Sequence, residues 1–530
     1  MLSSTLLVAS GLAPVASAAL YDTVIETKYG PVKGYPAFNS TSTGNMTNWK
    51  DITVWKGIPF AASTGGENRW KAPQPASPWK KNGTLDAHTW GPVCPSVTTG
   101  YNDYTIDEDC LNLNIWSPAK KTDEKLPVVM WSYPAESTAA DPLFDGGGMA
   151  DKGIVFVNYN YRTGPFGWLA HSELSEEFEK VTGSNSSGNW GMLDQFAALK
   201  WIRANIADFG GDPEHITVQG QSAGSAATQH ILYSPLTKGL IVGAIIESGV
   251  RDPHDPLCTS LAEAYGTLDT ALKSGVTYLE NLNVSTIAEA RGLTMKELIG
   301  GATGTTREST IMFEATLDYY AMPDTYLNIL KKGLAHDVPV ITGNNKDENG
   351  ATYGLELTLQ EYYEDLNETY SSGWVDRFLE LYPANESTAA GAYNSMFTDR
   401  SKVGTWFWTQ MWYSARSSKV WNYFWDHAPP GQTSGAYHES EINYVLNNLY
   451  ATTELPWKAE DYEIAKRMND YWANFIKTGN PNGADTTVAW PAVSSKKEVQ
   501  HVGDGWGQIP IAWSKKITLF KNWFATLVAY

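Results

Sequence analysis

The chain has 530 residues, 42% of them hydrophobic, and a formal net charge of −19 at pH 7. Because the acidic residues are spread along the chain and not gathered in a tail, this charge argues against a nucleic acid or an anionic membrane as a partner. The length and the ordinary globular composition fit one large α/β domain, which we predict for residues 19–530.

The first 18 residues have the pattern of a secretory signal peptide. An apolar run over residues 6–15 is followed by Ala16, Ser17 and Ala18, a small-residue cleavage site. No later stretch is long and apolar enough to span a bilayer. Seven N-x-S/T sequons, typical of a glycosylated protein, occur at Asn39, Asn45, Asn82, Asn185, Asn283, Asn367 and Asn385. We therefore predict a secreted, extracellular glycoprotein with a signal peptide over residues 1–18.

Taken in order, the chain alternates short apolar runs with helical patterns. Strands are predicted over residues 29–34, 53–61, 108–116, 126–131, 153–159, 216–218, 243–249, 338–343 and 420–425. Residues 188–209 have helical periodicity, which a Gly-Gly-Asp-Pro run at residues 210–213 ends. Strands that alternate with helices favour the α/β class, with a large, mostly parallel central sheet covered by helices on both faces.

The strand predicted at residues 216–218 leads into Gly220-Gln221-Ser222-Ala223-Gly224, and small helix-compatible residues follow. A G-x-S-x-G sequence between a strand and a helix is the pattern of a nucleophile elbow. The turn is so tight that side chains at Gly220 and Gly224 would collide, and it aims the backbone N–H of Ala223 at the reacting centre as an oxyanion donor. A glycine-bracketed serine in an ordinary loop is the alternative, and the flanking strand and helix disfavour it.

With these motifs the chain resembles the type-B carboxylesterase/lipase family, the cholinesterase-like branch of the α/β-hydrolase fold. The matching stretches follow the family order at residues 29–34, 108–116, 158–167, 191–195, 209–224, 338–350 and 435–445. The resemblance implies an α/β-hydrolase fold and a serine esterase. No metal-spaced His/Cys/Asp cluster and no phosphate-binding glycine loop occurs in the sequence, so we expect neither a metal nor a cofactor.

The resemblance implies a catalytic triad of Ser222, Glu348 and His438. Glu348 lies in the family's acid motif after a predicted strand, and His438 lies in the family's histidine loop. The order Ser, Glu, His along the chain is that of α/β-hydrolases. Taken alone, Glu348 would be interpreted as part of a solvated acidic turn and His438 as a surface histidine; together, in order and in motif, they favour the triad. Asp347 is a neighbouring acid, but the family register favours Glu348.

The oxyanion loop departs from the family pattern. In the family, a strand ending in Trp leads to a His/Tyr-Gly-Gly-Gly loop, whose second and third glycines donate N–H groups. Residues 132–136 here read Ser-Tyr-Pro-Ala-Glu, which places the donors at Ala135 and Glu136. Ala and Glu resist a positive φ, and a Glu136 carboxylate would oppose a developing oxyanion. We expect either that Glu136 binds a cationic or hydroxylated substrate, giving a narrow substrate range, or that generic ester hydrolysis is weakened. The triple glycine at residues 146–148 matches a later family segment.

Other parts of the resemblance concern substrate and stability. Tyr133, Glu136, Arg251 and His254 are candidate pocket residues, although solvated loop positions are the preferred interpretation of the last two. Aromatic residues at 406–408 and 412 either line the pocket or pack in the core. The resemblance also implies two structural ion pairs, Arg69 with Glu108 and Arg162 with Asp194.

The three cysteines carry a further prediction. Cys94 and Cys110 bracket a short polar segment and predict a disulfide in an oxidising compartment. Cys258 is left over, and a buried, unreactive thiol is the preferred interpretation. The corresponding loop of family lipases and cholinesterases is longer, so the short loop here favours soluble esters over a lipase flap.

Together these features predict a secreted serine carboxylesterase that acts on a small-molecule ester, with its oligomeric state left open. One alternative keeps the triad for acyl transfer, cyclisation or elimination in small-molecule biosynthesis. The other is a non-catalytic, cholinesterase-like binding protein. Such proteins usually lose a triad member and carry a stalk and a membrane span, and this sequence shows neither change.

Overall fold

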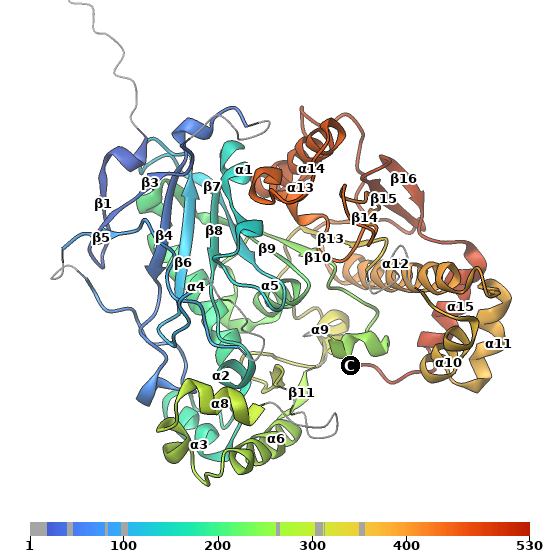
Figure 1. Cartoon of the computed structure of the whole chain (residues 1–530), viewed down its shortest axis with the longest axis horizontal. Coiled ribbons are helices and arrows are strands. Elements are labelled where there is room, and N and C mark those ends of the chain that lie inside the picture. Colours follow the sequence, from blue (N-terminus) through green and yellow to red (C-terminus); the bar gives the residue numbers. More distant parts are fainter. Residues whose placement is uncertain are drawn as a thin grey trace, which may run out of the picture.

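The computed structural model describes residues 19–39, 46–79, 83–96, 104–260, 265–302, 311, 313–348 and 356–530, without the side chains of residues 259–260. Its centre is an eleven-stranded sheet with the order β16-β15-β14-β13-β10-β9-β7-β8-β6-β4-β3 (Figure 1). These strands are β3 (Tyr35–Pro36), β4 (Thr53–Pro59), β6 (Asn112–Ser117), β7 (Leu126–Ser132), β8 (Val155–Tyr159), β9 (Gly211–Gln221), β10 (Gly243–Glu247), β13 (Val340–Asn345), β14 (Val420–Trp425), β15 (Glu498–Val502) and β16 (Gly507–Pro510). Two small sheets contain β1 (Val24–Glu26), β2 (Pro31–Lys33) and β5 (Leu85–Asp86), and β11 (Gly266–Thr267) and β12 (Thr316–Leu317).

The helices fall between and after the strands. They are α1 (Gly147–Asp151), α2 (Gly164–Trp168), α3 (Ser172–Thr182), α4 (Trp190–Asn205), α5 (Ala223–Tyr233), α6 (Leu268–Asn281), α7 (Ile287–Arg291), α8 (Met295–Ala302), α9 (Tyr326–Lys332), α10 (Leu359–Tyr370), α11 (Ser372–Leu381), α12 (Ala389–Ala415), α13 (Ile442–Leu446), α14 (Ala459–Thr478) and α15 (Ser514–Phe524). Among the residues described, no helix is long and apolar enough to cross a membrane.

The sheet is mixed. From β8 through β7, β9, β10, β13 and β14 to β15 neighbouring strands run parallel, whereas the β3–β4, β4–β6, β6–β8 and β15–β16 pairs are antiparallel. Every residue of β8, β10 and β14 is buried. Continuous burial is expected of parallel strands that are covered on both faces.

Helices cover both faces of the sheet (Figure 1). α4 packs on β9, and α5 packs on β7, β9 and β10. α5 lies on the face that carries Gly220, because a side chain there would collide with the carbonyl of Gly224. α14 lies on the opposite face, where its Phe475 packs over Gly243. This arrangement confirms the predicted α/β class.

The strand predictions are confirmed in place, with differences at the ends. Residues 216–218, predicted as the end of a buried strand, lie inside β9, which begins at Gly211. The residues between Gly211 and Ile216 are half-buried or exposed and form no apolar run, so this part of the strand carries no signal in the sequence. Of the helices, only α4 and the helix that follows the elbow, α5, were predicted, and β1, β3, β5, β11, β12, β15 and β16 were not predicted. α12 in particular has apolar residues on several sides and a glycine in its interior, so it shows no single apolar stripe.

The disulfide expected from the cysteine positions and the two ion pairs expected from the resemblance are present. Cys94 and Cys110 form a disulfide with their Cα atoms 4.9 Å apart, and Cys258 is a free, buried thiol. The guanidinium of Arg69 lies 2.5 Å from Glu108. Arg162 lies 2.7 Å from Asp194, and both of these side chains are buried.

Candidate active site

Ser222 occupies the turn between β9 and α5, and its backbone has φ 55° and ψ −120°. A left-handed φ at a non-glycine residue is a strained conformation that surrounding structure must hold. The Ser222 N–H donates to the carbonyl of Glu247 at 3.0 Å. A Cβ at Gly220 would collide with the Gly224 carbonyl, and one at Gly224 would collide with the carbonyl of Ser132. The two elbow glycines are therefore required by packing.

His438 and Glu348 lie in the two loops that follow β14 and β13. His438 Nδ1 is 2.5 Å from Glu348 Oε2, and Glu348 Oε1 accepts the Asn345 N–H at 2.7 Å. Gln221, next to Ser222, has its Nε2 3.5 Å from His438 Nε2, so the other ring nitrogen faces the elbow. Asp347 instead accepts hydrogen bonds from the Ala436 N–H and the Asn394 side chain. Glu348, not Asp347, thus pairs with the histidine.

The contact between His438 and Glu348 shifts the pKa of both side chains. Burial lowers the pKa of His438, but the charge of Glu348 and the hydrogen bond with it outweigh burial, and the pKa ends above its usual range. Burial raises the pKa of Glu348, but the charge of His438 and the hydrogen bonds outweigh it, and this pKa ends below its usual range. The arrangement stabilises an imidazolium facing the elbow, as a general base needs.

The loop at residues 132–136 lies against the elbow, because Ser132 is the register partner of Gly220 and contacts Gly224. Ala135 and Glu136 are exposed, and of the two only Glu136 has a positive φ, 61°. The expected strain therefore falls on Glu136. Tyr133 is buried, and its ring stacks on that of Tyr161 with centroids 4.9 Å apart. This side chain anchors the loop to the core.

Glu439, next to His438 in the chain, interacts electrostatically with carboxyl groups of two other loops. Burial raises the pKa of Glu439, the charge of His438 lowers it, and the charges of Asp141 and Glu136 raise it further. The net shift is upward. The charges of Glu136 and Asp141 therefore act on Glu439, and we call these three carboxyl groups the acidic rim.

The remaining candidate pocket residues are held by neighbours. His254 Nδ1 is 2.8 Å from Asp252 Oδ1, within its own loop. The carbonyl of half-buried Arg251 accepts a hydrogen bond from the Tyr326 hydroxyl at 3.1 Å. Trp408 and Trp412 are buried and stacked with centroids 5.1 Å apart, so they belong to the core. Trp406 is also buried, and Phe407 packs against the hydrophobic cluster formed by α10, α11, α12 and α15.

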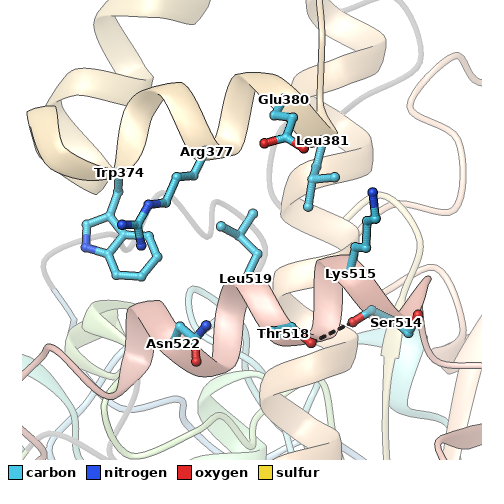
Figure 2. A pocket seen from close by; sticks show the side chains of 9 residues that line it. All are labelled: Trp374, Arg377, Glu380, Leu381, Ser514, Lys515, Thr518, Leu519 and Asn522. Atoms are coloured by element: carbon cyan, nitrogen blue, oxygen red, sulfur yellow. Dashed lines mark hydrogen bonds between the residues drawn. The ribbon is translucent and has the colours of Figure 1, made fainter.

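Two features outside the predicted site are notable. A cleft of about 470 Å³ lies between α11 and α15, where Arg377 covers the ring of Trp374 (Figure 2), and no predicted site residue lines it. Two buried carboxyls, Glu247 and Glu441, lie near the triad and were not predicted. The only sequence signal for Glu247 is an acid inside an otherwise apolar strand. Over the described ranges, no cluster of three or more His, Cys, Asp or Glu side chains is arranged to hold a metal.

Comparisons with known proteins agree with this architecture. The model of the family described as "Carboxylesterase family" matches residues 21–505. The chain is 32% identical over 473 residues to a fumonisin B1 esterase of Sphingopyxis macrogoltabida, covering 86% of this chain and 84% of that protein. It is 30% identical over 495 residues to a para-nitrobenzyl esterase of Bacillus subtilis (strain 168), covering 88% and 92%. A solved structure of a thermophilic PNB esterase has a TM-score of 0.74 and 27% identity, covering 94% of this chain and 99% of that one. A carboxylesterase of Geobacillus stearothermophilus has a TM-score of 0.74 and 26% identity, covering 94% and 100%.

Proposed function

Because the chain belongs to the carboxylesterase family and is a serine hydrolase that acts on carboxylic esters, we propose that Ser222, His438 and Glu348 are its catalytic triad. The observation that carries the proposal is the joint geometry of the elbow and the histidine. Ser222 is held in a strained turn at the end of β9, and His438 is held by Glu348 with its other nitrogen toward that turn. An oriented base beside a serine is what activates the hydroxyl.

In the proposed reaction the Ser222 hydroxyl attacks the ester carbonyl carbon while His438 takes its proton. The N–H groups of Ala223, Ala135 and Glu136 hold the resulting oxyanion. His438 then protonates the leaving alcohol as the C–O bond breaks and an acyl-enzyme remains. A water molecule, deprotonated by His438, attacks the acyl carbon, and the Ser222 oxygen leaves with the proton. Glu348 holds the imidazole and offsets its positive charge in both halves.

We propose a narrow substrate range, set by the rim of Glu136, Asp141 and Glu439. These carboxyls favour an ester that carries a cation or hydroxyl groups close to the scissile bond. Non-glycine residues at 135 and 136 also make the oxyanion loop less adaptable than a glycine loop. One relative is named for fumonisin B1 and another for para-nitrobenzyl esters, so different substrates occur within the family.

We further propose that the protein is secreted and glycosylated. The sequon residues Asn39, Asn185, Asn283, Asn367 and Asn385 are all exposed, as glycosylation requires. Asn45, Asn82 and residues 1–18 lie outside the described residues. The Cys94–Cys110 disulfide is compatible with an oxidising compartment.

The test is hydrolysis of p-nitrophenyl esters of increasing acyl length by the purified protein and by Ser222→Ala. We expect turnover that needs Ser222 and falls as the acyl chain lengthens, and labelling of Ser222 by a fluorophosphonate. Product analysis with water and with an added alcohol separates hydrolysis from acyl transfer. Absence of both turnover and labelling would contradict the proposed triad.

A further inference from the structure

A layer of polar side chains is buried beneath the proposed triad, on the face of the sheet that α14 covers. Gln221, Glu247 and Gly343 are register partners on neighbouring strands, so they lie on the same face of the sheet. Because side chains alternate along a strand, the residues two positions away on each strand also lie on this face. The polar side chains of the layer are Gln219 and Gln221 of β9, Glu247 of β10, Asn345 of β13 and Tyr423 of β14, and all are buried. Glu441, just before α13, is fully buried and contacts the layer through Asn345 of β13.

Each buried carboxyl has one oxygen satisfied. Glu247 Oε1 accepts from Gln219 Nε2 at 3.0 Å and from Trp472 Nε1 at 2.7 Å. Glu441 Oε2 accepts from Asn345 Nδ2 at 2.5 Å. The other oxygen of each carboxyl has no hydrogen-bond partner among the described residues. Among the described residues the two carboxyls therefore depend on neutral donors, the amides of Gln219 and Asn345 and the indole of Trp472, and neither forms an ion pair.

Among the described side chains of this layer, the acceptors without a partner outnumber the donors without one, of which the Tyr423 hydroxyl is an example. Within the described part of the chain, the side-chain oxygens of Gln219, Gln221 and Asn345 also lack partners, like the second oxygens of the two carboxyls. An ionised carboxylate only accepts hydrogen bonds, whereas a protonated carboxyl also donates one. Two buried negative charges in one site also repel each other and are poorly solvated. A proton on one or both carboxyls relieves both defects.

We propose that Glu247 and Glu441 are a proton-holding pair that keeps at least one proton at neutral pH and so limits the negative charge beneath His438. The proposal rests on the proposed function, because the pair acts through His438. Both are positioning residues, since neither reaches the reacting atoms. Glu247 has a second link to the site, because its carbonyl accepts the hydrogen bond from the Ser222 backbone N–H.

The titratable groups around the pair agree with this assignment. Burial raises the pKa of Glu247 to about 8. Burial, and then the charges of Glu247 and Glu348, raise the pKa of Glu441 to about 8. Among described residues the other titratable groups that interact with the pair are Glu348, His438, Tyr423 and Tyr437. Of these groups only His438 can become cationic, and none is a Lys or Arg. The negative charge of the pair is therefore offset by bound protons and not by a basic side chain.

The protonation of the pair affects the pKa of His438. The negative charge of Glu441 raises the pKa of His438, in addition to the larger effect of Glu348. A protonated pair removes that contribution, so His438 is free to act as a base at lower pH. It also avoids placing a second charge beneath a reaction that builds negative charge on the substrate oxygen.

The test compares the acid limb of kcat/KM in the wild type, Glu247→Gln, Glu441→Gln and the double variant. Glu247→Gln removes the neighbour that raises the pKa of Glu441, so Glu441 ionises at lower pH and the acid limb moves up by about one pH unit. Glu441→Gln leaves no charge at that position, so its acid limb does not move up. The double variant is expected to lose the upward shift. A purely structural role would lower kcat in all variants without this pattern.

A second measurement does not need activity. Infrared difference spectra of Ser222→Ala are expected to show a protonated-carboxyl band that is lost as the pH rises through about 8. Adding Glu247→Gln should move its titration to lower pH. Absence of that band, an equal acid limb in all four proteins, or a shift that persists in the double variant would overturn the pair. Turnover that survives Ser222→Ala would instead overturn the triad and leave the infrared test of the pair intact.

Discussion

Two backbone turns meet at the candidate active site, the elbow at residues 220–224 and the loop at residues 132–136, and they keep their shapes by different means. Both contain a non-glycine residue with a left-handed φ, Ser222 in the elbow and Glu136 in the loop. In the elbow, glycines at 220 and 224 are required because a Cβ at either would strike a carbonyl oxygen. In the loop, Ala135 and Glu136 are exposed, and their side chains extend away from the core.

This difference shows which positions must keep their residue for the turn to form, and at which positions the side chain can vary with the substrate. Packing on every side leaves no freedom at the elbow, so its sequence follows the motif. In the proposed mechanism the loop contributes only its backbone N–H groups to the reaction, so a side chain can be added there at the cost of a strained φ. The loop is therefore the place where this chain departs from its family.

The largest effect is expected at the acid of the triad. Glu348→Gln keeps the shape but removes the charge that orients and stabilises His438, and kcat should fall by roughly 10³–10⁴-fold. Asp347→Asn is the matched control, because this neighbouring acid bonds Ala436 and Asn394 and not the histidine. The measurement is the steady-state kcat of both variants and the wild type on one p-nitrophenyl ester. An equal loss in both variants would mean that the loop, and not the Glu348 charge, is needed.

A smaller but still large effect is expected from filling the elbow. Gly224→Ala places a methyl group against the Ser132 carbonyl, so the free energy of unfolding should fall by about 1–3 kcal/mol, and activity should fall with it. Gly373→Ala in α11 is the control, because nothing lies within 4 Å of the added Cβ. Because Gly373 lies in the first turn of α11, the free energy of unfolding of this variant should stay within about 0.5 kcal/mol of the wild type. Denaturant unfolding of both variants measures the contrast, and equal destabilisation would refute the packing argument.

The same contrast explains what the sequence could reveal. The elbow is a local motif that a short pattern predicts, whereas Glu348 and His438 are assigned from the resemblance to the family and from the order of the three residues along the chain. Glu247 and Glu441 escape prediction because their proximity depends on the register of β9, β10 and β13 and on the helix that covers them. β15 is another case, because residues 498 and 501 are only half-buried and the strand carries no continuous apolar run. The burial of a residue that depends on tertiary contacts cannot be predicted from the residues next to it in the sequence.

The smallest effect, and the one that sharpens the comparison most, is expected at Glu136. Glu136→Gly relieves the left-handed strain and removes the charge, so kcat/KM on a neutral acetate ester should rise by about 10-fold, whereas Glu136→Gln removes only the charge. If the rim binds cations, both variants should lose preference for the acetate of a quaternary ammonium alcohol over its neutral tert-butyl isostere. Comparing the two variants on the two esters separates backbone strain from charge, because only the glycine relieves the first. Unchanged kinetics in both variants would mean that Glu136 affects neither the oxyanion nor the substrate, and the narrow range would then need another cause.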